Sequence, residues 1–76
     1  MKQPVIDFLI ANEFERMELN RYVNHSCNVT YRGGHYVVSN NDGWAMYSKD
    51  ENIYWLIGVL TYYGYIDKNY KQINNQ

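Results

Sequence analysis

One stretch of the sequence constrains the fold of this chain more than any other feature. In it, apolar and polar residues alternate strictly, and two consecutive glycines follow. From Cys27 to Arg32, apolar residues alternate with polar ones, which is the period of a β-strand with one buried face. Gly33-Gly34 follows, and both central positions of a type I′ hairpin turn need a positive φ, which glycine adopts without steric cost. Pairing Arg32 with His35 across this turn brings the apolar residues of both strands to one face. The sequence therefore predicts an antiparallel hairpin in that register.

A second turn is predicted at residues 41–43, Asn-Asp-Gly. A three-residue loop with Gly43 in the left-handed conformation would pair Val38 with Met46 and place Met46 on the apolar face. A two-residue turn would place Tyr47 on that face instead. We expect the longer loop, because it buries more apolar area, and with it a third strand.

The N-terminal segment predicts an amphipathic helix. Pro4 suits the first helical turn, where its missing N–H is not needed. Glu13 interrupts the apolar side, so the helix is expected to end or kink near Asn12. Residues 15–26 leave two alternatives open, a second short helix through Met17 or a loop that leads to the sheet. The side chains that share the apolar side of the helical wheel are Val5, Ile6, Leu9, Ile10 and Phe14.

A C-terminal helix is expected from about Lys49 to Tyr63. Residues 48–51 match the capping box, in which Ser48 and Glu51 would each satisfy a free backbone N–H of the first helical turn. Gly64 is the expected end of the helix, because glycine readily takes the left-handed conformation that follows a last helical turn.

The predicted fold is therefore α+β with the element order α-β-β-β-α. Three antiparallel strands would form one sheet, and two helices would pack on one face of it. Residues 1–66 are expected to form a single compact domain and residues 67–76 a polar, flexible C-terminal tail. A 76-residue chain buries only about 60% of its unfolded surface, so its stability is small unless a disulfide, a metal or a second chain contributes. Cys27 is the only cysteine, which excludes an intramolecular disulfide.

The apolar surface of the C-terminal helix is wider than one core face needs. At about 100° per residue the apolar arc spans roughly 220°, whereas a one-sided helix needs a stripe only somewhat over ~100° wide. One part of the arc is the expected core face, made of Ile53, Leu56, Ile57, Leu60 and Tyr63. The other part is a second face, made of Trp55, Gly58, Val59 and Tyr62.

This second face predicts association with another chain. The interpretation is a non-enzymatic protein–protein interaction module that acts through homodimerisation or through docking of a different protein. Gly58 costs roughly 1 kcal/mol relative to alanine inside a helix, and it could allow another backbone to approach closely. The alternative is that the first helix or residues 15–26 cover the face within the monomer. The small size and the lack of recognisable chemistry resemble the general run of phage or mobile-element accessory proteins.

A small nucleic-acid-binding domain is the second hypothesis. The outer face of the sheet would carry Arg32, His35 and, depending on the turn, Tyr47, and exposed aromatic side chains on a sheet can stack single-stranded bases. Nucleic-acid-binding proteins usually carry a basic excess, because much of their affinity comes from neutralising phosphates. The formal net charge here is −1, so this hypothesis ranks below protein association.

The candidates for catalysis or metal binding are His25, Cys27 and His35. Two imidazoles and one thiol lack the fourth ligand and the spacing of a zinc site, and His35 is expected on the face opposite Cys27. A nucleophilic cysteine would need an adjacent base in an electropositive setting, for which only His25 is available. We therefore interpret Cys27 as a buried structural residue and expect no enzymatic activity, metal, cofactor or small-molecule ligand.

The sequence also predicts a soluble, cytoplasmic protein without a membrane association. The apolar part of the N-terminal segment is interrupted by Asp7 and lacks the features of a signal peptide. The longest apolar candidate, residues 53–63, is much shorter than the ~18 residues of a membrane span.

Overall fold

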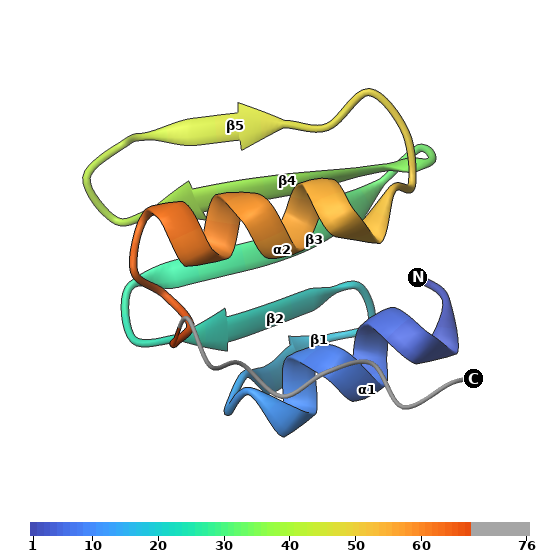
Figure 1. Ribbon diagram of the computed structural model, residues 1–76, viewed down its shortest axis with the longest axis horizontal. Coiled ribbons are helices and arrows are strands. Elements are labelled where there is room, and N and C mark those ends of the chain that lie inside the picture. The colour runs from blue at the N-terminus through green and yellow to red at the C-terminus, as the bar shows by residue number, and fades with distance from the viewer. Residues whose placement is uncertain (68–76) are drawn as a thin grey trace.

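The computed structural model describes residues 1–67, and they form an α+β fold in which both helices lie on the same face of one antiparallel sheet (Figure 1). The sheet has five strands in the order β1-β2-β3-β4-β5, so each strand pairs only with its neighbours in the sequence. The expected C-terminal tail beyond Asp67 lies outside the described residues. The elements are α1 (Gln3–Ala11), β1 (Glu15–Glu18), β2 (Arg21–Asn24), β3 (Cys27–Arg32), β4 (His35–Asn40), β5 (Ala45–Tyr47) and α2 (Ile53–Tyr62).

The hairpin between β3 and β4 confirms the predicted turn and register. Gly33 and Gly34 have φ values of 54° and 89°, and Arg32 pairs with His35. The turn between β4 and β5 is also the expected three-residue loop, since Gly43 has a φ of 89° and Val38 pairs with Met46.

The prediction of three strands was wrong, because residues 15–26 form neither a helix nor a loop but the two further strands β1 and β2. Tyr22 of β2 pairs with Val29 of β3, and its fully buried ring belongs to the core. The other large apolar residues of this segment, Met17 and Leu19, are exposed. The positions of these two residues therefore did not indicate the buried face, and the alternation typical of a strand could not be recognised in this segment.

The predicted start of α2 and its capping box at Ser48 and Glu51 were also wrong. The helix begins at Ile53, and the side chain of Asn52 caps it by accepting the backbone N–H of Tyr54 at 2.8 Å. The hydroxyl of Ser48 is already engaged in the sheet, where it accepts the backbone N–H of Tyr36 at 2.7 Å. Ser48 thus directly follows β5 and is still bound to β4, and a short connection separates it from the helix.

Both helices end in a Schellman motif. After α1, the N–H groups of Phe14 and Glu13 donate to the carbonyls of Leu9 (2.9 Å) and Ile10 (3.0 Å), and Glu13 takes a φ of 70°. The predicted end of α1 near Asn12 is confirmed. Gly64, with a φ of 78°, holds the corresponding position after α2, as predicted.

The core lies between the sheet and the two helices. Of the expected core face of α2, Leu56, Ile57 and Leu60 are buried and Ile53 is half-buried, whereas Tyr63 is 42% exposed. Within residues 1–67, neither helix is long and apolar enough to cross a membrane. The buried apolar cluster consists of Val5, Phe8, Leu9, Phe14, Tyr22, Cys27, Val29, Tyr36, Val38, Leu56, Ile57, Leu60 and Ile66.

Candidate protein-interaction surface

A groove of about 400 Å³ runs along the side of α2 that faces β5. In Figure 1, α1 lies on the opposite side of α2, next to β1 and β2, so α1 does not cover this groove. The four predicted interface residues all line it, and three further residues were missed from the sequence. The lining of this α2–β5 groove is Met46, Tyr54, Trp55, Gly58, Val59, Tyr62 and Tyr63.

The groove has a partly packed floor and an exposed rim. Trp55 and Val59 are half-buried and pack against the core cluster. Tyr54 and Tyr62 are 74% and 81% exposed, and they stand on the same side of α2 because they are separated by two helical turns. The rings of these two tyrosines are therefore exposed to solvent above a half-buried apolar floor, and no described residue covers them.

An aromatic cluster fixes the C-terminal end of the groove. The rings of Trp44 and Tyr63 have centroids 4.6 Å apart and an interplanar angle of 58°. Tyr62 meets Tyr63 edge-on, at 4.9 Å and 85°. This contact joins the start of β5 to the end of α2, and it accounts for Tyr63 leaving the core face on which the helical wheel had placed it.

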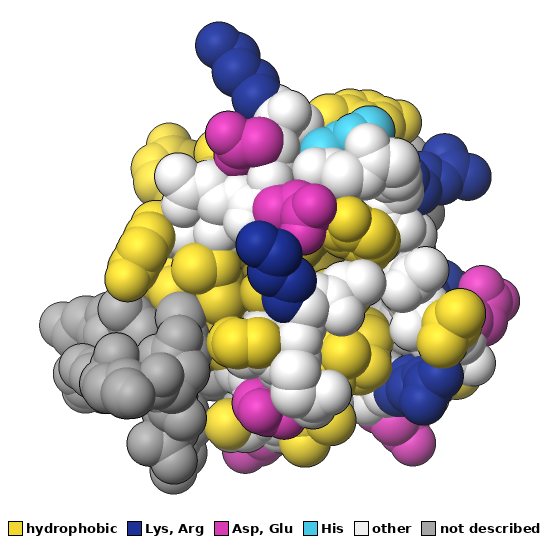
Figure 2. All heavy atoms as spheres, turned by 90° about the vertical axis from the view of Figure 1, so that its right-hand side faces the viewer, with side chains coloured by type: hydrophobic (Ala, Val, Ile, Leu, Met, Phe, Trp, Pro, Cys, Tyr) yellow, Lys and Arg dark blue, Asp and Glu magenta, His cyan; other side chains and the backbone are white. Residues whose placement is uncertain are grey.

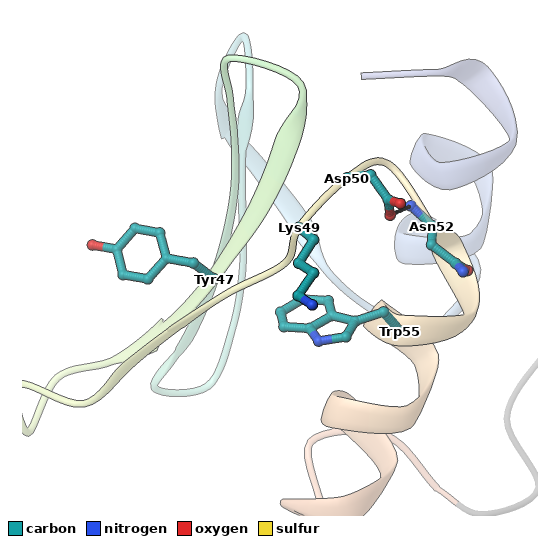
Figure 3. Close-up of a pocket in the computed structure, with 5 residues that line it drawn as sticks. All are labelled: Tyr47, Lys49, Asp50, Asn52 and Trp55. Atoms are coloured by element: carbon teal, nitrogen blue, oxygen red, sulfur yellow. Dashed lines mark hydrogen bonds between the residues drawn. The ribbon is translucent and has the colours of Figure 1, made fainter.

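A second, more polar hollow of about 340 Å³ adjoins the N-terminal end of α2 (Figure 3). Trp55 lines both hollows, and Tyr47 lines only the second one. The carboxylate of Asp50 accepts the backbone N–H of Asn52 at 3.0 Å, and Lys49 extends on the side of the Trp55 indole, whereas Tyr47 points away from it (Figure 3). The charged groups therefore stand at one end of the groove and not along it.

Gly58 lies in the middle of the groove and is exposed. It has no positive φ, and a Cβ atom built at this position would meet no heavy atom within 4 Å. The described residues therefore leave room for a side chain at residue 58, and no contact among them requires a glycine there.

Met46 brings β5, which is an edge strand, to the side of the groove. Backbone hydrogen bonds join Ser48 to Tyr36 and Asn40 to Trp44. Because such bonds alternate along an antiparallel pair, the intervening Ala45 and Tyr47 direct their backbone N–H and C=O groups away from β4.

The outer face of the sheet brings together the three residues of the nucleic-acid hypothesis. Arg32 pairs with His35, and the rings of His35 and Tyr47 have centroids 6.1 Å apart. A shallow hollow of about 340 Å³ on this face contains Arg32 and Tyr47, and also Arg21 and Glu18, which form an ion pair at 3.2 Å. Figure 2 views the molecule from the end that carries the β3–β4 turn, and at that end acidic and basic side chains are interspersed among apolar ones.

The candidates for chemistry are not assembled into a site. Cys27 is completely buried, and this burial raises the pKa of its thiol to about 12. His25 is exposed in the turn between β2 and β3. Residues 1–67 contain no cluster of three or more histidine, cysteine, aspartate or glutamate side chains that could hold a metal ion.

Of the three hollows described, the α2–β5 groove has the most apolar lining. Comparison of the chain with protein-family models, with curated protein sequences and with solved structures gives no match. The basis for assigning a function is therefore the surface of the chain itself.

Proposed function

We propose that this chain is a non-enzymatic protein–protein interaction module that binds through the α2–β5 groove. The observation that supports the proposal is the set of aromatic rings that stand exposed around a half-buried floor. Tyrosine and tryptophan are enriched at protein interfaces, where a rigid ring contributes a large contact area at a low entropic cost. The largest apolar patch on the surface of a monomeric protein is often a functional site.

The shape of the groove favours a helical occupant. Six of its seven lining residues belong to α2 or directly follow it, and Met46 of β5 completes the lining. Proteins commonly bind an amphipathic helix in such a groove, through apolar side chains one helical turn apart. Lys49 and Asp50 at one end would help to set the direction of that helix.

The proposal is tested by photo-crosslinking in cells. A photoreactive amino acid replaces Tyr62 in the groove or, as a control, Tyr47 on the outer face of the sheet, which is also an exposed tyrosine. We expect discrete adducts from position 62 that disappear when Val59→Asp is added to the same chain, with the fold verified by circular dichroism. Equal labelling at both positions, or no adduct from position 62, would contradict a role for the groove.

A nucleic-acid-binding domain remains the second candidate, because Arg32, His35 and Tyr47 share the outer face of the sheet. The net charge of −1 and the acidic neighbour Glu18 weigh against it. Binding of a fluorescent oligothymidine that weakens steeply with salt and is lost in Arg32→Ala would support it. No binding at low ionic strength would eliminate it.

A further inference from the structure

We infer that the occupant of the α2–β5 groove is α2 of a second copy of this chain, in a two-fold symmetric dimer whose two α2 helices run antiparallel and cross near Gly58. This inference rests on the proposed function, because it requires the groove to be a binding surface, and it adds the identity and orientation of the occupant.

The first argument comes from the shape of α2 around Gly58. Tyr54, Gly58 and Tyr62 are spaced four residues apart and form one ridge on the helix surface. The two tyrosines are 74% and 81% exposed, and the glycine leaves a notch between them. Since a Cβ atom at residue 58 would touch nothing in the monomer, the notch is available to an approaching backbone.

The second argument is the symmetry of this ridge. A large ring stands four residues before the notch and an equal ring stands four residues after it. When two such helices cross antiparallel at their notches, Tyr54 of one copy meets Tyr62 of the other, and the same contact is repeated across the two-fold axis. The surface is thus complementary to itself, which is what a two-fold interface requires.

The third argument is electrostatic. Near a two-fold axis, each charged side chain lies close to its own counterpart, and like charges repel. The seven residues that line the groove are uncharged, so two copies meet there without repulsion. The antiparallel arrangement also sets the positive N-terminal end of each helix dipole beside the negative C-terminal end of the other.

The exposed area is sufficient for a dimer of modest affinity. A tyrosine side chain contributes roughly 150–250 Å², so the exposed parts of Tyr54, Tyr62 and Tyr63 amount to about 400 Å² on that scale. With the other groove residues, each copy could bury at most on the order of 500 Å², or about 1,000 Å² in total. That is near the lower limit for a specific interface, and dissociation in the micromolar range is the corresponding expectation.

The oligomeric state is measured by sedimentation velocity on the full chain from about 1 to 500 µM. We expect a monomer–dimer equilibrium that Tyr62→Lys abolishes and that Tyr47→Lys, the matched change on the outer face, leaves unaltered. Gly58→Ala should raise the melting temperature of the dilute monomer and yet weaken dimerisation at least tenfold. Dimerisation of Gly58→Ala as tight as that of the unmodified chain would overturn the crossing at residue 58.

Disulfide trapping tests the orientation. Chains carrying Tyr54→Cys are mixed with chains carrying Tyr62→Cys and are oxidised mildly, with the unmodified chain as the control for Cys27. The antiparallel crossing predicts that mixed disulfides between positions 54 and 62 dominate. Disulfides that join 54 to 54 and 62 to 62 would instead overturn the antiparallel arrangement.

A chain that remains monomeric at 500 µM would overturn the inference as a whole. The crosslinking experiment then separates this failure from that of the proposed function. Adducts from position 62 to a different protein would preserve the interaction module with another occupant. The absence of any adduct from position 62 would contradict both the dimer and the proposed function of the groove.

Discussion

The hydroxyl of Ser48 replaces a backbone carbonyl in its pairing with Tyr36. The backbone N–H of Ser48 donates to the Tyr36 carbonyl at 2.9 Å, as in an ordinary antiparallel pair. The return bond runs from the Tyr36 N–H to the Ser48 side-chain oxygen at 2.7 Å, and that hydroxyl donates in turn to the carbonyl of Asp50 at 2.7 Å. One buried side chain thus completes the sheet and shapes the connection to α2.

Ser48→Ala should therefore lower the free energy of unfolding by about 1–3 kcal/mol, because it leaves a buried backbone N–H without its acceptor. Chemical denaturation measures the change. Glu51→Ala is the control, since a capping box would make the two changes similarly costly. A loss for Ser48→Ala no larger than that for Glu51→Ala would show that the sheet does not depend on the hydroxyl.

Glu13→Gly should stabilise the protein by about 0.5–1 kcal/mol. Glu13 has a φ of 70°, a conformation that is unfavourable for residues with a Cβ atom and that glycine adopts freely. Gly64→Ala is the converse change at the same position of the other Schellman motif, and it should destabilise by about 1 kcal/mol. Thermal unfolding compares both variants with the unmodified chain, and a destabilising Glu13→Gly would contradict this account of the turn.

Stability should fall in alkaline solution between about pH 9 and pH 12. Burial raises the pKa of Cys27 from 9.0 to about 12 and, with the nearby Glu51 carboxylate adding to it, the pKa of Tyr36 from 10.0 to about 12. Above pH 9 the unfolded chain loses these protons before the folded chain does. The folded state then binds more protons, so the free energy of unfolding decreases as pH rises, by up to about 1.4 kcal/mol per pH unit for each group.

Cys27→Ala separates the two contributions to this pH dependence. The variant is less stable at every pH because of the cavity it leaves, but its decline should begin near pH 10, where the unfolded-state titration of Tyr36 begins, and not near pH 9. Urea denaturation at intervals of half a pH unit detects the difference. Identical pH profiles for the variant and the unmodified chain would show that Cys27 does not contribute.

Truncation should lower stability strongly on the buried face of α2 and hardly at all on its exposed face. Leu60 is fully buried, so Leu60→Ala should cost about 2–5 kcal/mol. Tyr62→Ala should change the stability of the dilute monomer by less than about 0.5 kcal/mol, because its ring is exposed. Denaturation at low micromolar concentration measures both, and a large loss for Tyr62→Ala would place its ring in the monomer core.

The part of the sheet whose turns are determined by glycines in the turns themselves was predictable from the sequence. Gly33-Gly34 and Gly43 fix two turns whose geometry only glycine accepts easily, and the register of β3, β4 and β5 follows from them. The turns around β1 and β2 use residues without such a preference. His25, for example, takes a φ of 54° that a histidine does not signal.

The lining of the proposed interaction surface, the α2–β5 groove, was predictable in part. The width of the apolar arc identified Trp55, Gly58, Val59 and Tyr62, because a helical wheel depends only on the sequence. It could not identify Met46, because that residue joins the groove through the pairing of β5. Tyr63 was misplaced because its contact with Trp44 depends on a fold that the wheel does not contain.

The sequential strand order has a consequence for how the chain folds. Since every strand pairs with its immediate neighbour, no long loop must close before the sheet can grow, and hairpins can add one after another from the tight turn at Gly33-Gly34. The docking of α2 on β4 joins segments that lie farther apart in the chain than the two strands of any of these hairpins. Until α2 docks, the apolar side of β4 is exposed to water, and such exposed apolar surface makes an incompletely folded chain prone to aggregation.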